Sequence, residues 1–306
     1  MDGFIVVDKP AEMTSHDVIR SVRRITGAKK AGHTGTLDPF ATGVLPVALG
    51  EGTKVIRFLD EGVKEYRAAM LLGEVTDTQD GTGTVTCRRD WRAVSQEDLA
   101  RVFAGFTGRI SQVPPMYSAL KHQGVPLYRI ARRGAEVARE PREIEIYSLV
   151  IDSCAPPEIF FTVRCSRGTY VRTLAHDMGE LLGCGAHLAG LQRTASGHFA
   201  LADAISLDGL AAIGGTESFK DIVISPYDAL AHLPDLQVNE KGAARIANGI
   251  PPAADDFIEL PATRPGRGEF VRLAMKKQLL AVAEIIGEGA GEMRLARVLN
   301  STAGRC

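Results

Sequence analysis

Apolar side chains recur at helical spacing in three segments of the chain. The first segment lies between a capping signal at residues 14–17 and Gly27, a residue type that often follows a helix end. The second opens at Ser95, and the third follows Thr169. The pattern therefore predicts helices from Thr14 to Gly27, from Ser95 through Phe103, and from Thr169 to Leu182.

Shorter apolar runs predict strands between and after these helices. The runs cover residues 1–8, 54–59, 64–72, 159–165, 270–274 and 279–286. Helices and strands alternate irregularly, with neither the rhythm of a parallel βαβ sheet nor an internal repeat. The order of elements therefore favours an α+β sheet protein.

The character of the chain changes near residue 235. Prolines stand at 226 and 234, and the tail is interrupted again at 251–252, 261 and 265. The rest of the tail consists of short strand-like runs with glycine turns, which suit a small β-barrel-like module. We therefore divide the chain into one domain over 1–234 and a β-rich domain over 235–306.

Composition indicates an ordinary globular protein. The 306 residues are 45% hydrophobic and 24% charged, and no apolar run approaches the roughly 20 residues that span a bilayer. The N-terminus lacks a basic leader, so we do not expect a signal peptide. The five cysteines include no Cys-x-x-Cys pair, which predicts reduced thiols and a cytoplasmic protein.

Charge is balanced overall and uneven locally. Lys and Arg number 36 against 37 Asp and Glu, so net charge gives no sign of nucleic-acid binding. Residues 121–142 carry six basic side chains and two acidic ones, and five more basic side chains lie between Arg20 and Lys30. Together the two segments fit a phosphate-contacting face, and each alone also fits a solvated helix surface.

The segment Gly32-His33-Thr34-Gly35-Thr36-Leu37-Asp38-Pro39 places one carboxylate in a constrained loop. Pro39 disfavours the α conformation for Asp38, so we expect Asp38 to end a bend with its side chain directed outward. The glycines permit a ligand to approach the backbone closely. An ordinary Asp-Pro turn would use the same residues, and the loop alone does not distinguish the two interpretations.

Tyr66, Tyr170 and Arg172 are further candidates for a site. The tyrosines offer rings on which an unpaired base can stack, or they are core residues with satisfied hydroxyl groups. Arg172 lies in the first turn of a predicted helix, where the helix dipole does not favour a cation. Either it is a surface arginine or it faces an acidic partner or ligand.

The motifs disfavour other chemistries. The seven histidines form no pair at metal-ligand spacing, and the chain has neither a Gly-x-Ser-x-Gly elbow nor a Gly-Lys-Ser/Thr phosphate loop. The remaining hypothesis is a carboxylate that acts without a metal or cofactor.

The Asp38 loop and its surroundings resemble the bacterial TruB-type tRNA pseudouridine-55 synthases. The resemblance is carried, in the family's order, by residues 7–10 with 14–16, 32–46, 66, 76–81, 113–121, 127–134, 168–172 and 191–199. It extends over residues 3–230. Glu12 departs from the pattern at a position where glycine is common, and the C-terminal tail matches only weakly.

The resemblance implies a pseudouridine synthase fold, with a mixed, largely antiparallel central sheet, followed by a small PUA-like RNA-binding domain. It also implies a set of residue roles. Asp38 is the nucleophile, Arg172 pairs with its carboxylate, and Tyr66 stacks on the target uracil. Tyr170 lies beside the base, and Leu191 shapes the pocket.

Five further residues are expected to serve the substrate. By the resemblance, His33 contacts nucleotides around the flipped base, and Lys9 and Pro10 support the catalytic loop. Arg132 and Arg133 are expected to contact phosphates. The implied substrate is the T-arm stem-loop of tRNA, in which uridine 55 is isomerised. We expect a monomer that needs no cofactor, metal, membrane or guide RNA.

Conversion of uridine to pseudouridine breaks the N1–C1′ bond, turns the uracil and rejoins it through C5, so it needs no redox partner. The carboxylate attacks either C6 of the ring or C1′ of the sugar, and the sequence does not distinguish these routes. Tyr170 is a candidate for removing the C5 proton. The rival hypotheses are a non-catalytic RNA-binding protein and a guide-RNA-dependent synthase of the dyskerin type, which the absence of Lys-rich tails disfavours.

Overall fold

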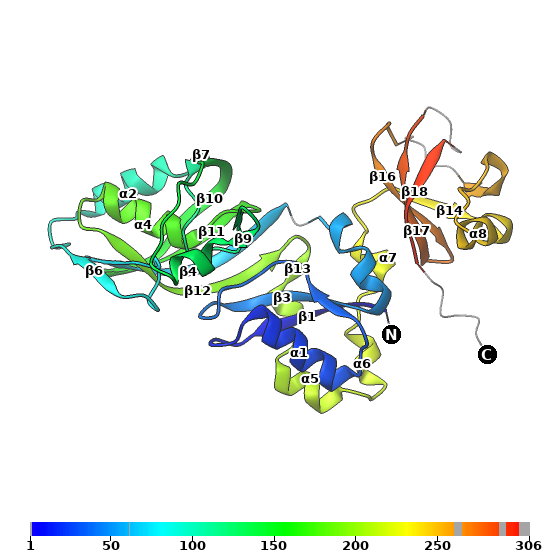
Figure 1. The fold of residues 1–306 in the computed structure, drawn as a ribbon, viewed down its shortest axis with the longest axis horizontal. Helices are drawn as coiled ribbons and strands as arrows, with labels where there is room; N and C mark the ends of the chain where they lie inside the picture. Colours follow the sequence, from blue (N-terminus) through cyan, green and yellow to red (C-terminus); the bar gives the residue numbers. More distant parts are fainter. Residues whose placement is uncertain (1, 61, 260–264, 288–291, 300–306) are drawn as a thin grey trace.

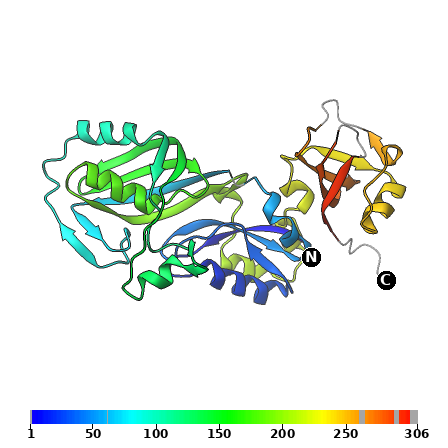
Figure 2. The same ribbon diagram turned by 45° about the horizontal axis from the view of Figure 1, so that its top comes forward.

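A computed structural model of the chain describes residues 2–60, 62–259, 265–287 and 292–299. Three stretches of the predicted C-terminal domain, 260–264, 288–291 and 300–306, lie outside the described residues. Figures 1 and 2 show a large lobe built on one long sheet and a smaller, β-rich lobe formed by the C-terminal residues.

The elements follow the chain in this order. The large lobe begins with β1 (Gly3–Lys9), α1 (Ser15–Thr26), β2 (Ala31–His33), β3 (Thr42–Leu49), the 3-10 helices η1 (Gly50–Lys54) and η2 (Ile56–Phe58), β4 (Val63–Leu72), β5 (Glu74–Thr76), β6 (Val85–Arg88), α2 (Gln96–Gly105) and β7 (Gly108–Gln112). It continues with β8 (Lys121–His122), β9 (Val125–Pro126), α3 (Leu127–Ala131), β10 (Arg142–Ala155), β11 (Glu158–Ser166), α4 (Val171–Leu181), β12 (Ala186–Ser196), β13 (Phe199–Ala200), η3 (Leu201–Asp203), α5 (Leu207–Ile213), α6 (Ser218–Asp221) and α7 (Pro226–Ala229). The small lobe contains β14 (Asp235–Val238), α8 (Glu240–Ala247), η4 (Ala254–Asp256), β15 (Phe257–Glu259), β16 (Phe270–Met275), β17 (Gln278–Ile285) and β18 (Met293–Val298).

A nine-stranded sheet organises the large lobe. Its strands follow the order β1-β3-β12-β4-β11-β10-β7, with β2 beside β3 and β13 beside β12. Neighbouring strands are antiparallel except β3 and β12, which run parallel. The predicted α+β class with a mixed, largely antiparallel central sheet is confirmed. A second sheet, in the order β15-β14-β16-β17-β18, forms the small lobe and begins at Asp235.

Helix α1 begins and ends where its capping residues predict. The Thr14 side chain accepts a hydrogen bond from the backbone of Asp17, the Asp17 carboxylate accepts one from the Thr14 backbone amide, and Gly27 follows the helix with φ 68°. The buried face of α1 packs against β1, β3 and α5. Helices α2 and α4 cover another part of the sheet, over β4, β10 and β11. In the described part of the chain, no helix is long and apolar enough to cross a membrane.

The strand predicted over 54–59 is wrong, because η1 and η2 occupy most of this segment. Val55 and Phe58 are both buried there, and their separation of three residues matches one turn of a 3-10 helix rather than the alternation of a strand. Their burial joins the lobes: the Phe58 ring packs edge-on against Phe270 of the small lobe, with ring centroids 5.0 Å apart.

Candidate active site

A cavity of about 190 Å³ opens at the large sheet, and five of the predicted site residues line it. These are Asp38, Tyr66, Tyr170, Arg172 and Leu191. They come from the loop after β2, from β4, from β12 and from the start of α4. A further wall is supplied by Ser118 and Ala119 of the segment 113–141 that connects β7 to β10, which we call the insert.

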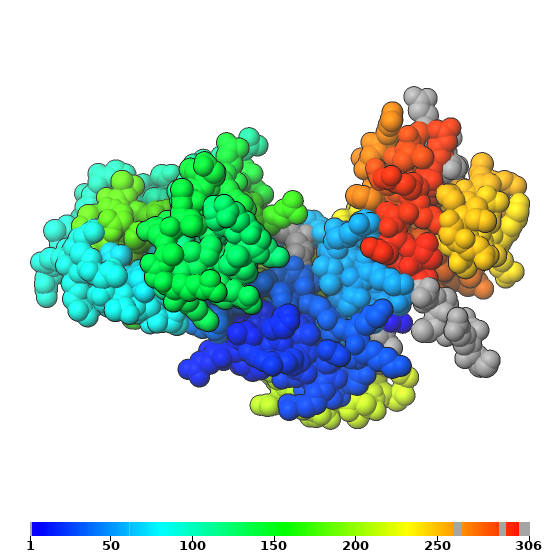
Figure 3. Space-filling view, in the orientation of Figure 1, coloured from blue at the N-terminus to red at the C-terminus, as the bar shows by residue number. Residues whose placement is uncertain are grey.

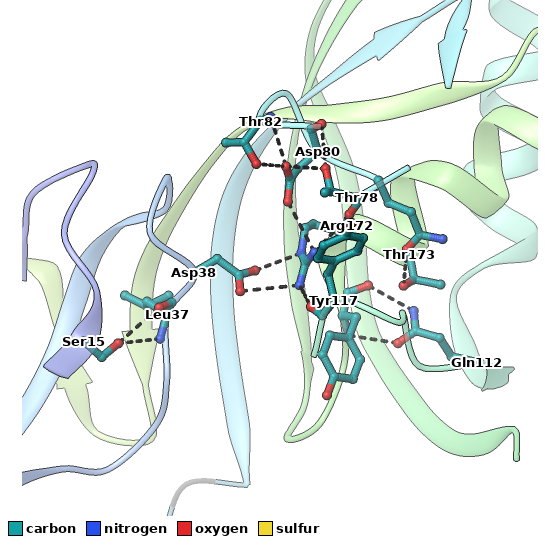
Figure 4. Close-up of polar contacts among 12 residues, drawn as sticks. Ser15, Leu37, Asp38, Thr78, Asp80, Thr82, Gln112, Tyr117, Arg172 and Thr173 are labelled. Carbon is teal, nitrogen blue, oxygen red and sulfur yellow. Dashed lines mark hydrogen bonds and ion pairs between the residues drawn. The ribbon is translucent and has the colours of Figure 1, made fainter. Parts of the chain in front are cut away.

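Asp38 and Arg172 form an ion pair at this cavity (Figure 4). Arg172 Nε lies 2.9 Å from Asp38 Oδ2, and Nη2 donates to Oδ1 at 3.4 Å. The Arg172 side chain is only 4% exposed, whereas that of Asp38 is 35% exposed. The expectation that Asp38 points simply outward is therefore wrong: the carboxylate turns toward Arg172 and remains partly accessible from the cavity.

Arg172 is held by three further groups. Its Nη1 lies 3.3 Å from Asp80 Oδ2 and donates to the Thr78 carbonyl at 3.0 Å, and its Nη2 donates to the Tyr117 carbonyl at 2.7 Å. Asp80 is itself fixed, since its Oδ1 accepts from Thr78 and Thr82 (Figure 4). Asp80 lies in the motif 76–81 but was not identified as a site residue, because no local pattern shows that this turn faces Arg172.

The surroundings of Asp38 act on its pKa in opposite directions. Burial raises the pKa of the Asp38 carboxyl, and the nearby charge of Asp80 adds to the rise. The guanidinium of Arg172 opposes the rise. Arg172 thus favours the ionised form of Asp38, which is the form that can act as a nucleophile.

Buried side chains hold the backbone on both sides of Asp38. On one side, Ser15 Oγ at the start of α1 donates to the Leu37 carbonyl at 3.1 Å and accepts from the Leu37 amide at 2.9 Å. On the other side, the ammonium of Lys9 donates to the carbonyls of Pro10 at 2.8 Å and Pro39 at 3.0 Å. Burial lowers the pKa of Lys9 to about 8. Lys9 therefore contacts the loop at Pro39 and also contacts Pro10, and the contribution of Ser15 was missed.

Arg193 also holds this loop and was likewise missed. It is fully buried, and it donates to the carbonyls of Val44 at 2.7 Å and Gly35 at 3.1 Å. Arg193 pairs with Tyr66 across β12 and β4, and its guanidinium lowers the pKa of Tyr66, which burial raises. One buried arginine therefore contacts the Asp38 loop from the strand that lies beside Tyr66.

The two tyrosines occupy different environments. Tyr66 is 7% exposed, so it is a core residue that also lines the cavity. Tyr170 is half-buried, and its backbone is held by Gln112 of β7, which accepts from the Tyr170 amide at 2.8 Å and donates to its carbonyl at 3.1 Å. Burial raises the pKa of Tyr170. Gln112 therefore positions the residue that immediately precedes α4.

The remaining predicted residues do not line the cavity. His33 is half-buried beside the His16 ring, with centroids 6.4 Å apart, and burial lowers its pKa. Arg132 and Arg133 are exposed on the insert just after α3. Among the described residues, no group of three or more His, Cys, Asp or Glu side chains could hold a metal ion.

Known proteins share both the sequence and the fold of this chain. Residues 23–171 match the N-terminal domain of the TruB family of pseudouridylate synthases, and residues 172–231 match the C-terminal domain of tRNA pseudouridylate synthase B. The tRNA pseudouridine synthase B of Geotalea uraniireducens is 58% identical over 304 residues, which is 98% of either chain. That of Geobacter sulfurreducens is 53% identical and covers 98% of this chain and 100% of its own.

Solved structures agree with this assignment. A chain of a Cbf5-Nop10-Gar1 complex superposes with a TM-score of 0.75 at 29% identity, covering 97% of this chain and 84% of its own. A chain of an H/ACA RNP bound to a substrate RNA gives 0.74 at 27% identity, covering 97% of this chain and 85% of its own. The predicted pseudouridine synthase fold is confirmed. The chain therefore belongs to the TruB family of pseudouridylate synthases, which are isomerases.

Proposed function

We propose that this chain converts uridine 55 in the T-arm loop of tRNA to pseudouridine, with Asp38 as the nucleophile. The observation that carries the proposal is the pair of Asp38 and buried Arg172, set in a cavity that Tyr66, Tyr170 and Leu191 also line. The names of the relatives, tRNA pseudouridine synthase B, support tRNA as the substrate.

The reaction needs only groups that the chain and the RNA supply. The Asp38 carboxylate attacks C6 of the uracil or C1′ of the ribose, and the N1–C1′ bond breaks with its electron pair going to the uracil. The base turns and a C5–C1′ bond forms. The bond between Asp38 and C6 or C1′ breaks and returns its electron pair to the carboxylate, C5 loses its proton and N1 gains one. Flipping the base out of its stack costs a few kcal/mol, which contact with the Tyr66 ring and Leu191 offsets.

The insert is proposed to bind phosphates of the T-arm. Arg129, Arg132 and Arg133 are exposed on and just after α3, and Ser118 and Ala119 bring the same segment to the cavity. Reversing the charges of Arg132 and Arg133 should weaken tRNA binding and flatten its salt dependence, because fewer counterions would be released. An unchanged salt slope excludes both arginines from phosphate contacts. We further propose that residues 235–306 are a PUA-like RNA-binding domain and that the chain acts as a monomer.

The direct test replaces the nucleophile. Asp38→Asn keeps the size of the side chain and removes its charge, so the variant should bind tRNA and release no tritium from tRNA labelled at C5 of uridine. Wild-type protein and Asp77→Asn, an exposed carboxylate in the turn that carries Asp80, serve as controls. Release by Asp38→Asn at a rate near that of the wild type would overturn the assignment.

A guide-dependent synthase is the second candidate, because the fold also superposes on a chain of an H/ACA RNP bound to substrate RNA. Purified protein alone, assayed on a bare T-arm stem-loop, separates the candidates. Turnover without any added RNA or protein supports the stand-alone enzyme. Turnover only after a guide RNA is added supports the second candidate, and binding without turnover under either condition supports a passive RNA-binding protein.

A further inference from the structure

One face of α1 is a basic surface that the proposed mechanism leaves unused. The helix exposes His16, Arg20, Arg23 and Arg24, and the chain adds exposed Lys29 and Lys30 beyond its end. We call these six residues the basic face of α1. At 100° per residue, the four helical positions fall within one sector of about 100°, away from the buried side chains that pack on the sheet.

The charges on this face are largely uncompensated. Asp17 is the one acidic residue of α1, and it is engaged by Arg20 and by the Thr14 cap. Elsewhere on the face, Arg23, Arg24, Lys29 and Lys30 form no ion pair with any carboxylate of the described residues. Like charges three and four positions apart destabilise a helix by a few tenths of a kcal/mol per pair. An anionic partner would relieve this repulsion, so the basic face fits such a partner.

The basic face begins at the nucleophile loop. Ser15, the first residue of α1, holds the backbone of Leu37, and the ring of the next residue, His16, packs edge-on against His33. From there the twelve residues of α1 lead away from the cavity for about 18 Å. The segment that carries α1 and the green insert lie on the same face of the molecule, with the insert above the helix (Figure 3).

We propose that the basic face of α1 binds the phosphate backbone of the RNA substrate beyond the loop that enters the cavity. The insert and α1 then hold the RNA from two sides, with Asp38 between them. An RNA strand carries phosphates at regular intervals, so the row of basic side chains from His16 to Arg24, which spans about 12 Å along the helix, reaches more than one of them in succession. This inference rests on the proposed function, because it takes the partner to be the tRNA substrate.

The test removes three of the six basic side chains of the face without altering the cavity. The triple variant Arg20→Gln, Arg23→Gln, Arg24→Gln keeps good helix formers at exposed positions. With full-length tRNA transcript, we expect KM to rise about tenfold, kcat to be retained, and the slope of log affinity against log salt to fall by about 2 to 3. With a short T-arm stem-loop, which extends less far from the cavity, the rise in KM should be smaller.

Arg101→Gln is the matched control. Arg101 follows Asp98 by three residues in the first turns of capped helix α2, as Arg20 follows Asp17 in α1, but α2 lies over a different part of the sheet. The control should leave KM and the salt slope of the wild type unchanged. If thermal unfolding shows that the triple variant is less stable than the wild type, the test is repeated with the double variant Arg23→Gln, Arg24→Gln, which keeps the Asp17–Arg20 pair.

Two results would overturn the inference: an unchanged salt slope for full-length tRNA in the triple variant, or an equal loss in Arg101→Gln. Failure of the proposed function is distinguishable, because it shows as absence of turnover by the wild type on both RNAs. The salt dependence of tRNA binding is measured in a titration that needs no turnover. It therefore tests RNA binding by the basic face whether or not the wild type turns over the RNA.

Discussion

Replacing Asp80 with Asn tests whether a buried carboxylate positions Arg172 for its contact with Asp38. Asn keeps the size of the side chain and an oxygen that can accept from Thr78 and Thr82, so the turn should persist. The change removes a negative charge that lies 3.3 Å from Arg172 Nη1, in a pair whose side chains are 5% and 4% exposed.

The size of the effect follows from that distance. At an effective dielectric constant of about 20, unit charges 3.3 Å apart interact by about 5 kcal/mol, which is an upper limit. Arg172 keeps its contacts with Asp38 and with the carbonyls of Thr78 and Tyr117, so only part of this interaction energy is lost from the folded state. We expect the free energy of unfolding to fall by about 2 kcal/mol. The rate of the chemical step should fall about 10- to 100-fold, which corresponds to about 1.4–2.7 kcal/mol.

The assay is tritium release from tRNA labelled at C5 of uridine, under single-turnover conditions and over a range of pH. Because Asp80 raises the pKa of Asp38, its removal should also shift the acid limb of the rate profile to lower pH. Asp77→Asn, in the same turn but exposed, should show neither change. A folded Asp80→Asn variant with the plateau rate and acid limb of the wild type would refute the positioning role.

Three further predictions concern the residues that hold the Asp38 loop. Ser15→Ala removes both bonds to Leu37 and should lower the free energy of unfolding in urea by about 1–3 kcal/mol; an unchanged midpoint contradicts this. The pKa of Lys9 falls from 10.5 to about 8 on folding, so the folded chain binds fewer protons between these values. Relative to Lys9→Met, the wild type should therefore gain about 3 kcal/mol as pH rises through this window, and parallel pH curves exclude the shift. Arg193→Lys should lower the free energy of unfolding by about 3 kcal/mol, because lysine cannot reach both Gly35 and Val44; wild-type stability in urea argues against that role.

Local signals in the sequence predicted those features that depend on residues close together along the chain. The capping box and Gly27 predicted the bounds of α1. Arg172 lies in the first turn of a helix, where the helix dipole does not favour a cation, and this position indicated an acidic partner. The sequence could not reveal Asp80 or Gln112, because each acts on a residue that only the sheet brings near. Ser15 was hidden for a different reason: its position suggested a helix start, and nothing local shows that its hydroxyl group faces Leu37.

Strand β11 was predicted correctly, but the sequence did not show which of its two faces is buried. Two consecutive phenylalanines obscure the alternation in the sequence, yet Ile159, Phe161 and Val163 are fully buried while Phe160 is 42% exposed. The register with β4 decides which ring enters the core, since Phe161 lies opposite Ala68 and Phe160 opposite Ala69. Small residues on β4 leave room on both faces, and Phe161 lies on the face that α2 covers, where its ring packs edge-on against Phe103 with centroids 5.6 Å apart.

The distribution of buried charge gives the site a positive character that suits the reaction. Lys9, Arg172 and Arg193 are all buried near the loop, and the carboxylates that pair with Arg172 are Asp38 and Asp80. Arg193 forms no ion pair within the described residues, and its charge acts on Lys9 and Tyr66. When the N1–C1′ bond breaks, negative charge passes to the uracil. Fixed cations stabilise a developing negative charge without needing to reorganise, so we expect the arrangement that holds the Asp38 loop to favour departure of the base in the proposed reaction.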